Sequence, residues 1–360
     1  MPLSKVEDIV FVRFELESLE PQKEYLKHFG MGIVEESDDS IYFKGAGRSP
    51  FIYMARKGKK NRFVSTAYRV AEFAELERLA KAFDVQIENS EEPGGGRKIT
   101  FSDPDGLGIE VFHGLEMVEP EPISPPRLNE GAEKRRTNAL QRFGDGAGEW
   151  RLEGEEWRYK LSSNVLRLGH TAVNVSDAPR SIAWYRETLG FISSDDFYMP
   201  DGACFGSFMR CDQGDRPVDH HTINLTGVMP EKLHFAGTFG HAGYELASSV
   251  DDLMAGHFHL KTQEKYTHEW GIGRHLLGSQ MYDYWRDPQG FTLEHWTDGD
   301  LLDASVPTNK VPVRDVIMAQ YGPLVPTTYN LTMPNKEIQD YRDSNPGFAD
   351  VARELEGLGS

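Results

Sequence analysis

Apolar positions in the first third of the chain alternate in some stretches and recur at helical spacing in others. Two stretches with helical spacing, residues 21–29 and 72–83, predict amphipathic helices, and Gly30 ends the first of them. Short apolar runs typical of strands flank each helix, at residues 8–16, 41–43, 51–54, 65–70 and 109–112. We therefore predict two β-α-β-β-β units in succession.

The same order of elements returns in the second half. The run LRLGHTAVNV predicts a strand, and Ser176 or Asp177 caps the helix that follows it. A further copy starts at His241. The repeat is closest where DPDGLGIE at 103–110 aligns without a gap with DPQGFTLE at 287–294. One module is thus used four times, which predicts an α+β fold of two domains, each built from two βαβββ modules.

Proline, glycine and charged residues mark two stretches outside the modules. The first contains EPEPISPPRLNEGAEKRR and is predicted to be a long linker, docked at its far end through Trp150 and Trp157. The second is a proline-rich, aperiodic tail, either an arm across a subunit interface or disordered. The predicted parts are an N-terminal domain at 1–118, the linker at 119–163, a C-terminal domain at 164–305 and the tail at 306–360.

Charge and composition limit the partners. A net charge of -18 repels phosphate, which excludes nucleic acid and anionic membrane surfaces as expected partners. We find no apolar run near 18 residues and no charged-then-apolar leader. Two cysteines, Cys204 and Cys211, are too few for a disulfide framework and lack zinc-site spacing. We therefore expect a cytoplasmic protein, and we expect it to form a homo-oligomer.

Two histidines and one glutamate take corresponding positions in the two C-terminal modules. Aligning HTAVNV with HAGYEL places His170 and His241 at the same point of equivalent strands. Glu294, on the strand predicted after the turn DPQG, supplies a third side chain. Two imidazoles and one carboxylate with open positions are the facial set of non-haem Fe(II) enzymes that handle O₂. A metal site in the C-terminal half is therefore predicted.

The N-terminal modules lack the two histidines. Their corresponding positions fall near Phe11 or Val12 and near Ser65, although Glu110 still matches Glu294. We assign Glu110 to structure and expect no metal in this domain.

Five segments carry a family resemblance: GHTAVNV, DHHTINL, HAGYEL, GRHLLGSQMYDYWRDPQG and FTLEHW. The chain resembles the type I extradiol catechol dioxygenases of the vicinal oxygen chelate superfamily, strongly over 164–300 and weakly over 5–115. The resemblance implies that each domain forms an incomplete barrel. It also implies that His170, His241 and Glu294 bind Fe(II), or less often Mn(II).

The resemblance assigns roles to three further residues. His221 is implied to be the acid-base histidine, and His275 and Tyr284 to hydrogen-bond the substrate and oxygen-derived intermediates. The implied reaction opens the ring of a catechol beside its two hydroxyls and inserts both atoms of the co-substrate O₂. We expect a small-molecule catecholic substrate.

Two alternative functions stay open at this point. One is another metal enzyme of the same superfamily, a glyoxalase or epimerase, which needs no O₂. The other is a metal-free protein that binds an aromatic compound. Five large side chains are candidate pocket walls that favour an aromatic or alkyl substituent on the substrate: Phe197, Met199, Phe205, Phe208 and Trp285.

Several other polar side chains have competing interpretations. His220 is expected to point away from His221, because neighbours in a strand face opposite sides. His234 precedes His241 by a few residues, but the repeat register argues against it as the ligand. Arg274 either reads a substrate carboxylate or holds its turn. Three more histidines are assigned to surface or helix packing: His257, His259 and His268.

Overall fold

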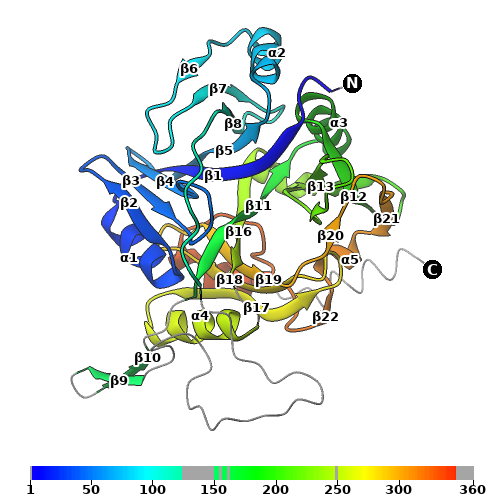
Figure 1. The fold of residues 1–360 in the computed structure, drawn as a ribbon. Helices are drawn as coiled ribbons and strands as arrows, with labels where there is room; N and C mark the ends of the chain where they lie inside the picture. The colour runs from blue at the N-terminus through cyan, green and yellow to red at the C-terminus, as the bar shows by residue number, and fades with distance from the viewer. Residues whose placement is uncertain (1, 124–149, 154–155, 160–162, 248–249, 346–360) are drawn as a thin grey trace, which may run out of the picture.

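The computed structural model describes residues 2–123, 150–153, 156–159, 163–247 and 250–345. Its two large sheets correspond to the two halves of the chain, coloured blue to cyan and green to orange in Figure 1. The first half contains two modules: β1 (Val6–Leu16), α1 (Glu20–Phe29), β2 (Gly32–Glu36), β3 (Ser40–Lys44) and β4 (Tyr53–Lys57), then β5 (Arg62–Val70), α2 (Phe73–Phe83), β6 (Glu88–Asn89), β7 (Arg97–Ser102) and β8 (Gly108–His113).

The second half repeats this order. Its modules are β11 (Val165–Val175), α3 (Ala178–Leu189), β12 (Phe191–Tyr198), β13 (Cys204–Cys211) and β15 (Ile223–Gly227), then β16 (Thr238–Leu246), α4 (Val250–Thr262), β17 (Thr267–His275), β18 (Met281–Arg286) and β19 (Thr292–Thr297). The short strand β14 (Val218–Asp219) lies between β13 and β15, and the 3₁₀ helix η1 (Pro230–Phe235) lies between the two modules. The predicted α+β fold with four βαβββ modules is confirmed.

Strand pairing is the same in both halves. The first strand of each half runs parallel to the last strand of its own module and antiparallel to the first strand of the next module. The orders are β2-β3-β4-β1-β5-β8-β7-β6 and, within the larger sheet, β12-β13-β15-β11-β16-β19-β18-β17. In neither sheet do the two end strands pair with each other, so each domain is an open barrel.

Local signals account for the helix ends. The carboxylate of Asp177 accepts a hydrogen bond from the Arg180 N–H at 3.0 Å, so Asp177, one of the two predicted caps, begins α3. Gly190 ends α3 in the left-handed conformation, with φ 77°. The helix buries Ile182 and Tyr185 against the sheet.

One hydrophobic core joins the two domains. The ring of Phe14 on β1 lies 5.3 Å from that of Phe239 and 4.7 Å from that of Phe291. Phe239 lies on β16, and Phe291 immediately precedes β19. The N-terminal domain therefore supports the strands that carry His241 and Glu294.

The tail differs most from the sequence prediction. It adds β20 (Leu301–Leu302), β21 (Asn309–Pro312), α5 (Arg314–Ile317), β22 (Ala319–Tyr321) and α6 (Asn335–Ser344). Strand β21 pairs with β12, and β22 pairs with β17, so the C-terminal sheet extends past the predicted boundary at 305. Disorder is thus wrong for residues 306–345. The segment lacks periodicity because it buries single side chains, such as Val325 and Leu331, rather than a regular face.

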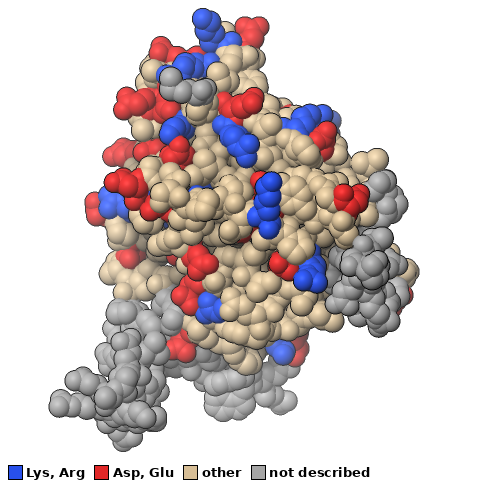
Figure 2. Space-filling view, turned by 90° about the vertical axis from the view of Figure 1, so that its right-hand side faces the viewer, with Lys and Arg blue, Asp and Glu red and all other residues tan. Residues whose placement is uncertain are grey.

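The predicted linker holds a hairpin of β9 (Trp150–Glu153) and β10 (Glu156–Tyr159). Residues 124–149, like the side chains predicted to dock there, lie outside the described residues. No described helix has the length and apolar character needed to cross a bilayer. Acidic and basic side chains are intermixed on the face drawn in Figure 2. Cys204 and Cys211 are both free thiols.

Candidate metal centre and active site

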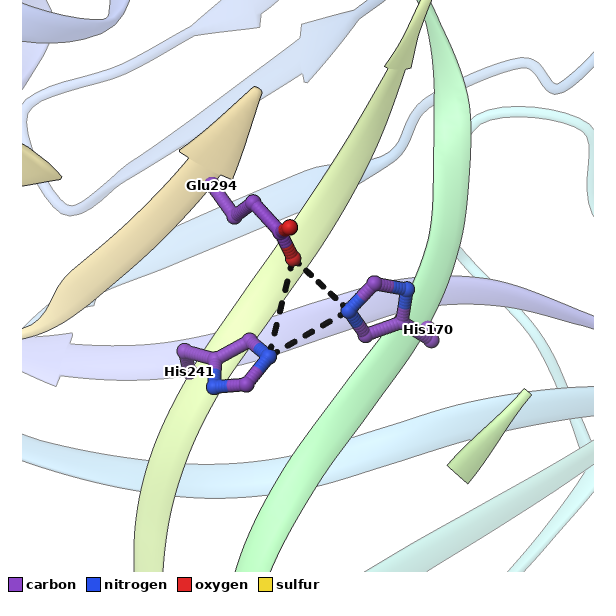
Figure 3. Close-up of side chains that lie close together, drawn as sticks. All are labelled: His170, His241 and Glu294. Carbon is purple, nitrogen blue, oxygen red and sulfur yellow. Dashed lines mark hydrogen bonds and ion pairs between the residues drawn. The ribbon is translucent and has the colours of Figure 1, made fainter. Parts of the chain in front are cut away.

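Three adjacent strands of the C-terminal sheet bring the predicted ligands together. His170 on β11 lies opposite Gly243 on β16, and Gly243 lies opposite Glu294 on β19. The two Nε2 atoms of His170 and His241 are 3.2 Å apart, and Glu294 Oε2 lies 2.9 Å from the first and 3.6 Å from the second (Figure 3). All three side chains are buried and point toward one another.

Gly243 leaves the space that the His170 ring occupies. A Cβ atom built there would lie 2.2 Å from Cε1 of His170 and 2.4 Å from its Nε2. Any larger residue would displace the imidazole.

The separations fit one metal ion. Two ligand atoms that are each about 2.1 Å from an ion and about 90° apart are about 3 Å from each other. Both carboxylate oxygens of Glu294 are buried and make no hydrogen bond to the described residues. Among these residues only His170, His241 and His275 form ion pairs with Glu294, and none of its partners is lysine or arginine. A buried carboxylate of this kind needs a cation.

The protonation states match those of metal ligands. Burial alone would raise the pKa of Glu294, but His170 and His275 beside it lower that pKa well below its usual range. Burial lowers the pKa of His241 to about 4, against the opposing effect of Glu294. At neutral pH the site therefore offers an anionic oxygen and a neutral His241 imidazole.

Asn330 orients His241 and was missed in the sequence. Its Oδ1 lies 2.6 Å from Nδ1 of His241, so that nitrogen donates and leaves Nε2 for a metal. Asn330 adopts the left-handed conformation with φ 58°, which asparagine tolerates well. No sequence pattern links this position in the aperiodic tail to a histidine on β16.

The three other predicted site residues surround the same point. The ring of His221 lies 4.3 Å from that of His170. Nε2 of His275 is 3.0 Å from the Tyr284 hydroxyl and 3.7 Å from Glu294 Oε1. With His241, these side chains line a small cavity of about 10 Å³. The structure thus brings all six predicted residues together.

The predicted orientation of His220 is wrong. Strand β14 ends at Asp219 and β15 begins at Ile223, so His220 and His221 lie between strands and do not alternate. Their Nδ1 atoms are 3.1 Å apart. His220 faces His221 and does not point away from it.

The N-terminal domain compensates its matching glutamate with a side chain. Phe11, Ala67 and Glu110 have the register of His170, Gly243 and Glu294, while Ser65 corresponds to His241. Arg13 donates to both oxygens of Glu110, at 2.7 and 2.9 Å. The position equivalent to Arg13 is Ala172 in the C-terminal domain. A guanidinium therefore neutralises the first carboxylate, and no lysine or arginine among the described residues does so for the second.

A second group with metal-ligand atoms is satisfied without an ion. His257 and His268 lie 3.1 and 2.7 Å from Oδ1 of Asp283, and the Trp285 indole N–H donates to Oδ2 at 2.6 Å. Both oxygens of this carboxylate therefore have side-chain partners. His259 is one of the buried residues of α4.

The other histidine and arginine candidates lie elsewhere. His234 is exposed on η1, away from the three clustered ligands. Arg274 donates to the carboxylate of Asp298 at 2.7 Å and to the Ser279 carbonyl at 2.6 Å, so it holds its turn.

A model of the Glyoxalase/Bleomycin resistance protein/Dioxygenase superfamily matches residues 167–295. This segment is a domain of that superfamily. Metapyrocatechase 2 of Cupriavidus necator is 25% identical over 332 residues, which cover 90% of this chain and 92% of the relative. The manganese-dependent 2,3-dihydroxybiphenyl 1,2-dioxygenase of Geobacillus genomosp. 3 is 24% identical over 76% of this chain and 79% of its own. The predicted resemblance to extradiol dioxygenases is confirmed, as is the prediction of an enzyme.

Solved structures share the fold of this protein along nearly the whole chain. The Mn(II)-bound glyoxalase from Novosphingobium aromaticivorans has a TM-score of 0.70 at 21% identity, with 93% of this chain and 97% of that chain covered. Homoprotocatechuate 2,3-dioxygenase from Arthrobacter globiformis has a TM-score of 0.67 at 22% identity, with 92% and 94% covered.

Proposed function

We propose that the protein is an extradiol dioxygenase that opens a catechol ring beside its two hydroxyls with both atoms of O₂. The metal is held by His170, His241 and Glu294. The observation that carries this proposal is the buried Glu294 carboxylate, which His170 and His241 flank and which no lysine or arginine of the described part of the chain neutralises. When bound, the ion supplies Lewis acidity, redox chemistry and open positions for the catechol and O₂.

His221 takes the proton that a catechol hydroxyl loses on binding. Burial, followed by the charges of His170 and His220, lowers the pKa of His221 well below its usual value, so the ring is neutral and begins as a base. His221→Gln is expected to keep its metal and bind catechol but to turn over roughly 10²-fold more slowly.

Tyr284 and His275 hold the reacting groups by hydrogen bonds. Burial and the neighbouring Glu294 raise the pKa of Tyr284 well above its usual value, so its hydroxyl remains a donor. The contact between that hydroxyl and His275 fixes the two side chains beside the open face of the site.

The pocket wall supports an apolar substituent on the catechol. A cavity of about 230 Å³ shares Val316 and Tyr329 with the small cavity at the ligands, and its lining has no charged side chain. Of the predicted walls, Phe197 and Phe205 line the larger cavity, and Phe208 the smaller.

Met199 and Trp285 are not walls of either cavity. Met199 lines a separate surface hollow, and Trp285 packs beside His257 and His268. The substituent that the remaining walls favour is an uncharged alkyl or aryl group.

Fe(II) is the metal we propose, with Mn(II) as the alternative. Two imidazoles and one carboxylate suit both divalent ions, and the facial set is typical of Fe(II) enzymes that use O₂. A cytoplasmic homo-oligomer stays a prediction from the sequence.

One anaerobic experiment tests the function. Apoprotein receives Fe(II) or Mn(II), then unsubstituted, alkyl-, aryl- or carboxylate-substituted catechol, and finally air. We expect equimolar O₂ uptake and yellow ring-opened product, with alkyl and aryl catechols preferred over the carboxylate. A glyoxalase would instead isomerise a hemithioacetal without O₂, and a binding protein would retain catechol without a metal and consume no O₂.

A further inference from the structure

Two buried side chains extend from His221 away from the proposed ligands. Oδ2 of Asp195, on β12, lies 2.6 Å from Nε2 of His220, and Nδ1 of His220 lies 3.1 Å from Nδ1 of His221. All three residues are at most 5% exposed. They form one hydrogen-bonded chain that ends at a wall of the inner cavity.

The direction of each hydrogen bond follows from the carboxylate. Burial raises the pKa of Asp195, but His220 and Asn309 outweigh burial and lower it, so Asp195 is ionised and only accepts. Nε2 of His220 therefore carries a proton towards Asp195. In the neutral form of the His220 ring, Nδ1 has a free lone pair and accepts. The remaining hydrogen bond requires Nδ1–H on His221. Nε2 of a neutral His221 is then left with its lone pair.

The chain is fixed from several elements. Asn309 on β21 donates to Oδ1 of Asp195 at 3.0 Å. The His220 N–H donates to the Asp300 carbonyl at 3.0 Å, and its own carbonyl accepts from the Ser194 hydroxyl at 2.5 Å. A Cβ at position 278 would lie 2.8 Å from Nδ1 of His220, so the ring occupies the space that the absent side chain of Gly278 leaves.

We propose that Asp195 and His220 are positioning residues that hold His221 in the tautomer whose Nε2 accepts the catechol proton. This proposal rests on the proposed function, in which His221 is the base. The proton moves from a catechol hydroxyl to Nε2 of His221, while Nδ1–H stays hydrogen-bonded to His220. The arrangement follows the physical logic by which a buried carboxylate sets the tautomer of a catalytic histidine.

Asp195→Asn reverses the direction of both hydrogen bonds that link residues 195, 220 and 221. Asn309 donates to the oxygen at this position, so the new amide turns its NH₂ toward His220. His220 must then accept at Nε2 and donate from Nδ1, and His221 must carry its proton on Nε2. The nitrogen that serves as the base is blocked, although no side chain has changed its size appreciably.

The test measures steady-state kinetics of the metal-loaded enzyme. We expect Asp195→Asn to lower kcat roughly 10- to 100-fold, with metal content, catechol dissociation constant and KM within two- to threefold of the parent. Asp196→Asn is the matched control, because the next side chain along β12 points to the other face of the strand, and it should stay near the parent value.

A double-mutant cycle separates positioning from a structural role. In a His221→Gln background Asp195→Asn should cost less than about twofold more, since its effect passes through His221. His220→Gln breaks the same hydrogen-bonded chain and should lower kcat by a similar factor. It replaces Asp195→Asn in the test if that variant does not fold. Equal slowing in both backgrounds would overturn the tautomer role and leave the proposed function intact. An unimpaired His221→Gln variant would overturn the tautomer role together with the base assignment.

Discussion

Replacing Asn330 by glycine tests whether the tail sets the metal affinity of the site. Asn330 is 5% exposed and accepts the only proton of the neutral His241 ring, at 2.6 Å. Its left-handed φ of 58° is readily adopted by glycine, so the change removes the side-chain acceptor without backbone strain.

The expected magnitude follows from the burial of both partners. Losing the acceptor leaves an imidazole N–H unpaired in a site where His241 is 2% exposed. A buried unpaired donor costs about 1–3 kcal/mol. Without metal the His241 ring can move its proton to Nε2 and escape this cost, whereas a metal on Nε2 prevents that, so the cost lowers the metal affinity by up to roughly 150-fold. Residues that orient a metal ligand typically contribute about 10- to 100-fold. We therefore expect Asn330→Gly to raise the metal dissociation constant about 10- to 100-fold.

Competition with a chelator of known affinity gives the dissociation constant for Fe(II) or Mn(II) under anaerobic conditions. Asn330→Asp is the matched control, because aspartate keeps an acceptor oxygen and also tolerates the left-handed conformation. It should bind metal at least as tightly as the parent. Equal affinity in the parent and in Asn330→Gly would show that the hydrogen bond to His241 does not prepare the ligand.

Three further outcomes are expected. Metal analysis of His241→Ala should show loss of the single tightly bound ion per chain, and two irons in the parent would contradict the assignment. Glu110→Gln should keep turnover within a few-fold while the free energy of unfolding falls by about 1.5–3 kcal/mol, because Arg13 stays paired with Glu92 at 2.6 Å; turnover as low as that of Glu294→Gln would refute a structural role. Burial raises the pKa of Asp287 to about 7, above the unfolded value near 4, so its contribution to stability is present below pH 4 and lost as pH rises through 7. Denaturant unfolding of Asp287→Asn should therefore show a flatter pH dependence between about 4 and 8, and an unchanged slope would contradict the shift.

The fourfold repeat of the βαβββ module made most of the fold predictable from the sequence. Each module carries its own alternation, helix cap and terminal glycine, so local signals and the register of the repeats agree. That register placed His170 and His241 on equivalent strands before any contact was known. It also located the N-terminal counterparts, where Phe11 and Ser65 take the histidine positions.

The errors have separate causes. His220 was placed in a strand, but β14 ends one residue earlier and leaves the backbone free to turn both imidazoles together. Trp285 was assigned to the pocket although it neighbours Tyr284 on β18, and alternation sends adjacent side chains to opposite faces. Asn309, Tyr329 and Asn330 reach the site from an aperiodic tail through long-range contacts that no periodicity encodes.

The guanidinium of Arg13 gives the two homologous domains different dependence on solution metal. The N-terminal carboxylate, Glu110, is paired with Arg13, a cation that is part of the chain. A chelator therefore does not change the stability that this pair gives to the N-terminal domain. In the proposed function the C-terminal carboxylate takes its cation from solution, and metal binding would stabilise the native state by RT ln(1 + [M]/Kd), where [M] is the free metal concentration. At a hundredfold excess over Kd this linkage is worth about 2.7 kcal/mol. Free metal would therefore change the stability of the chain through the C-terminal carboxylate alone, and a chelator would lower that stability without disturbing the pairing of Glu110 with Arg13.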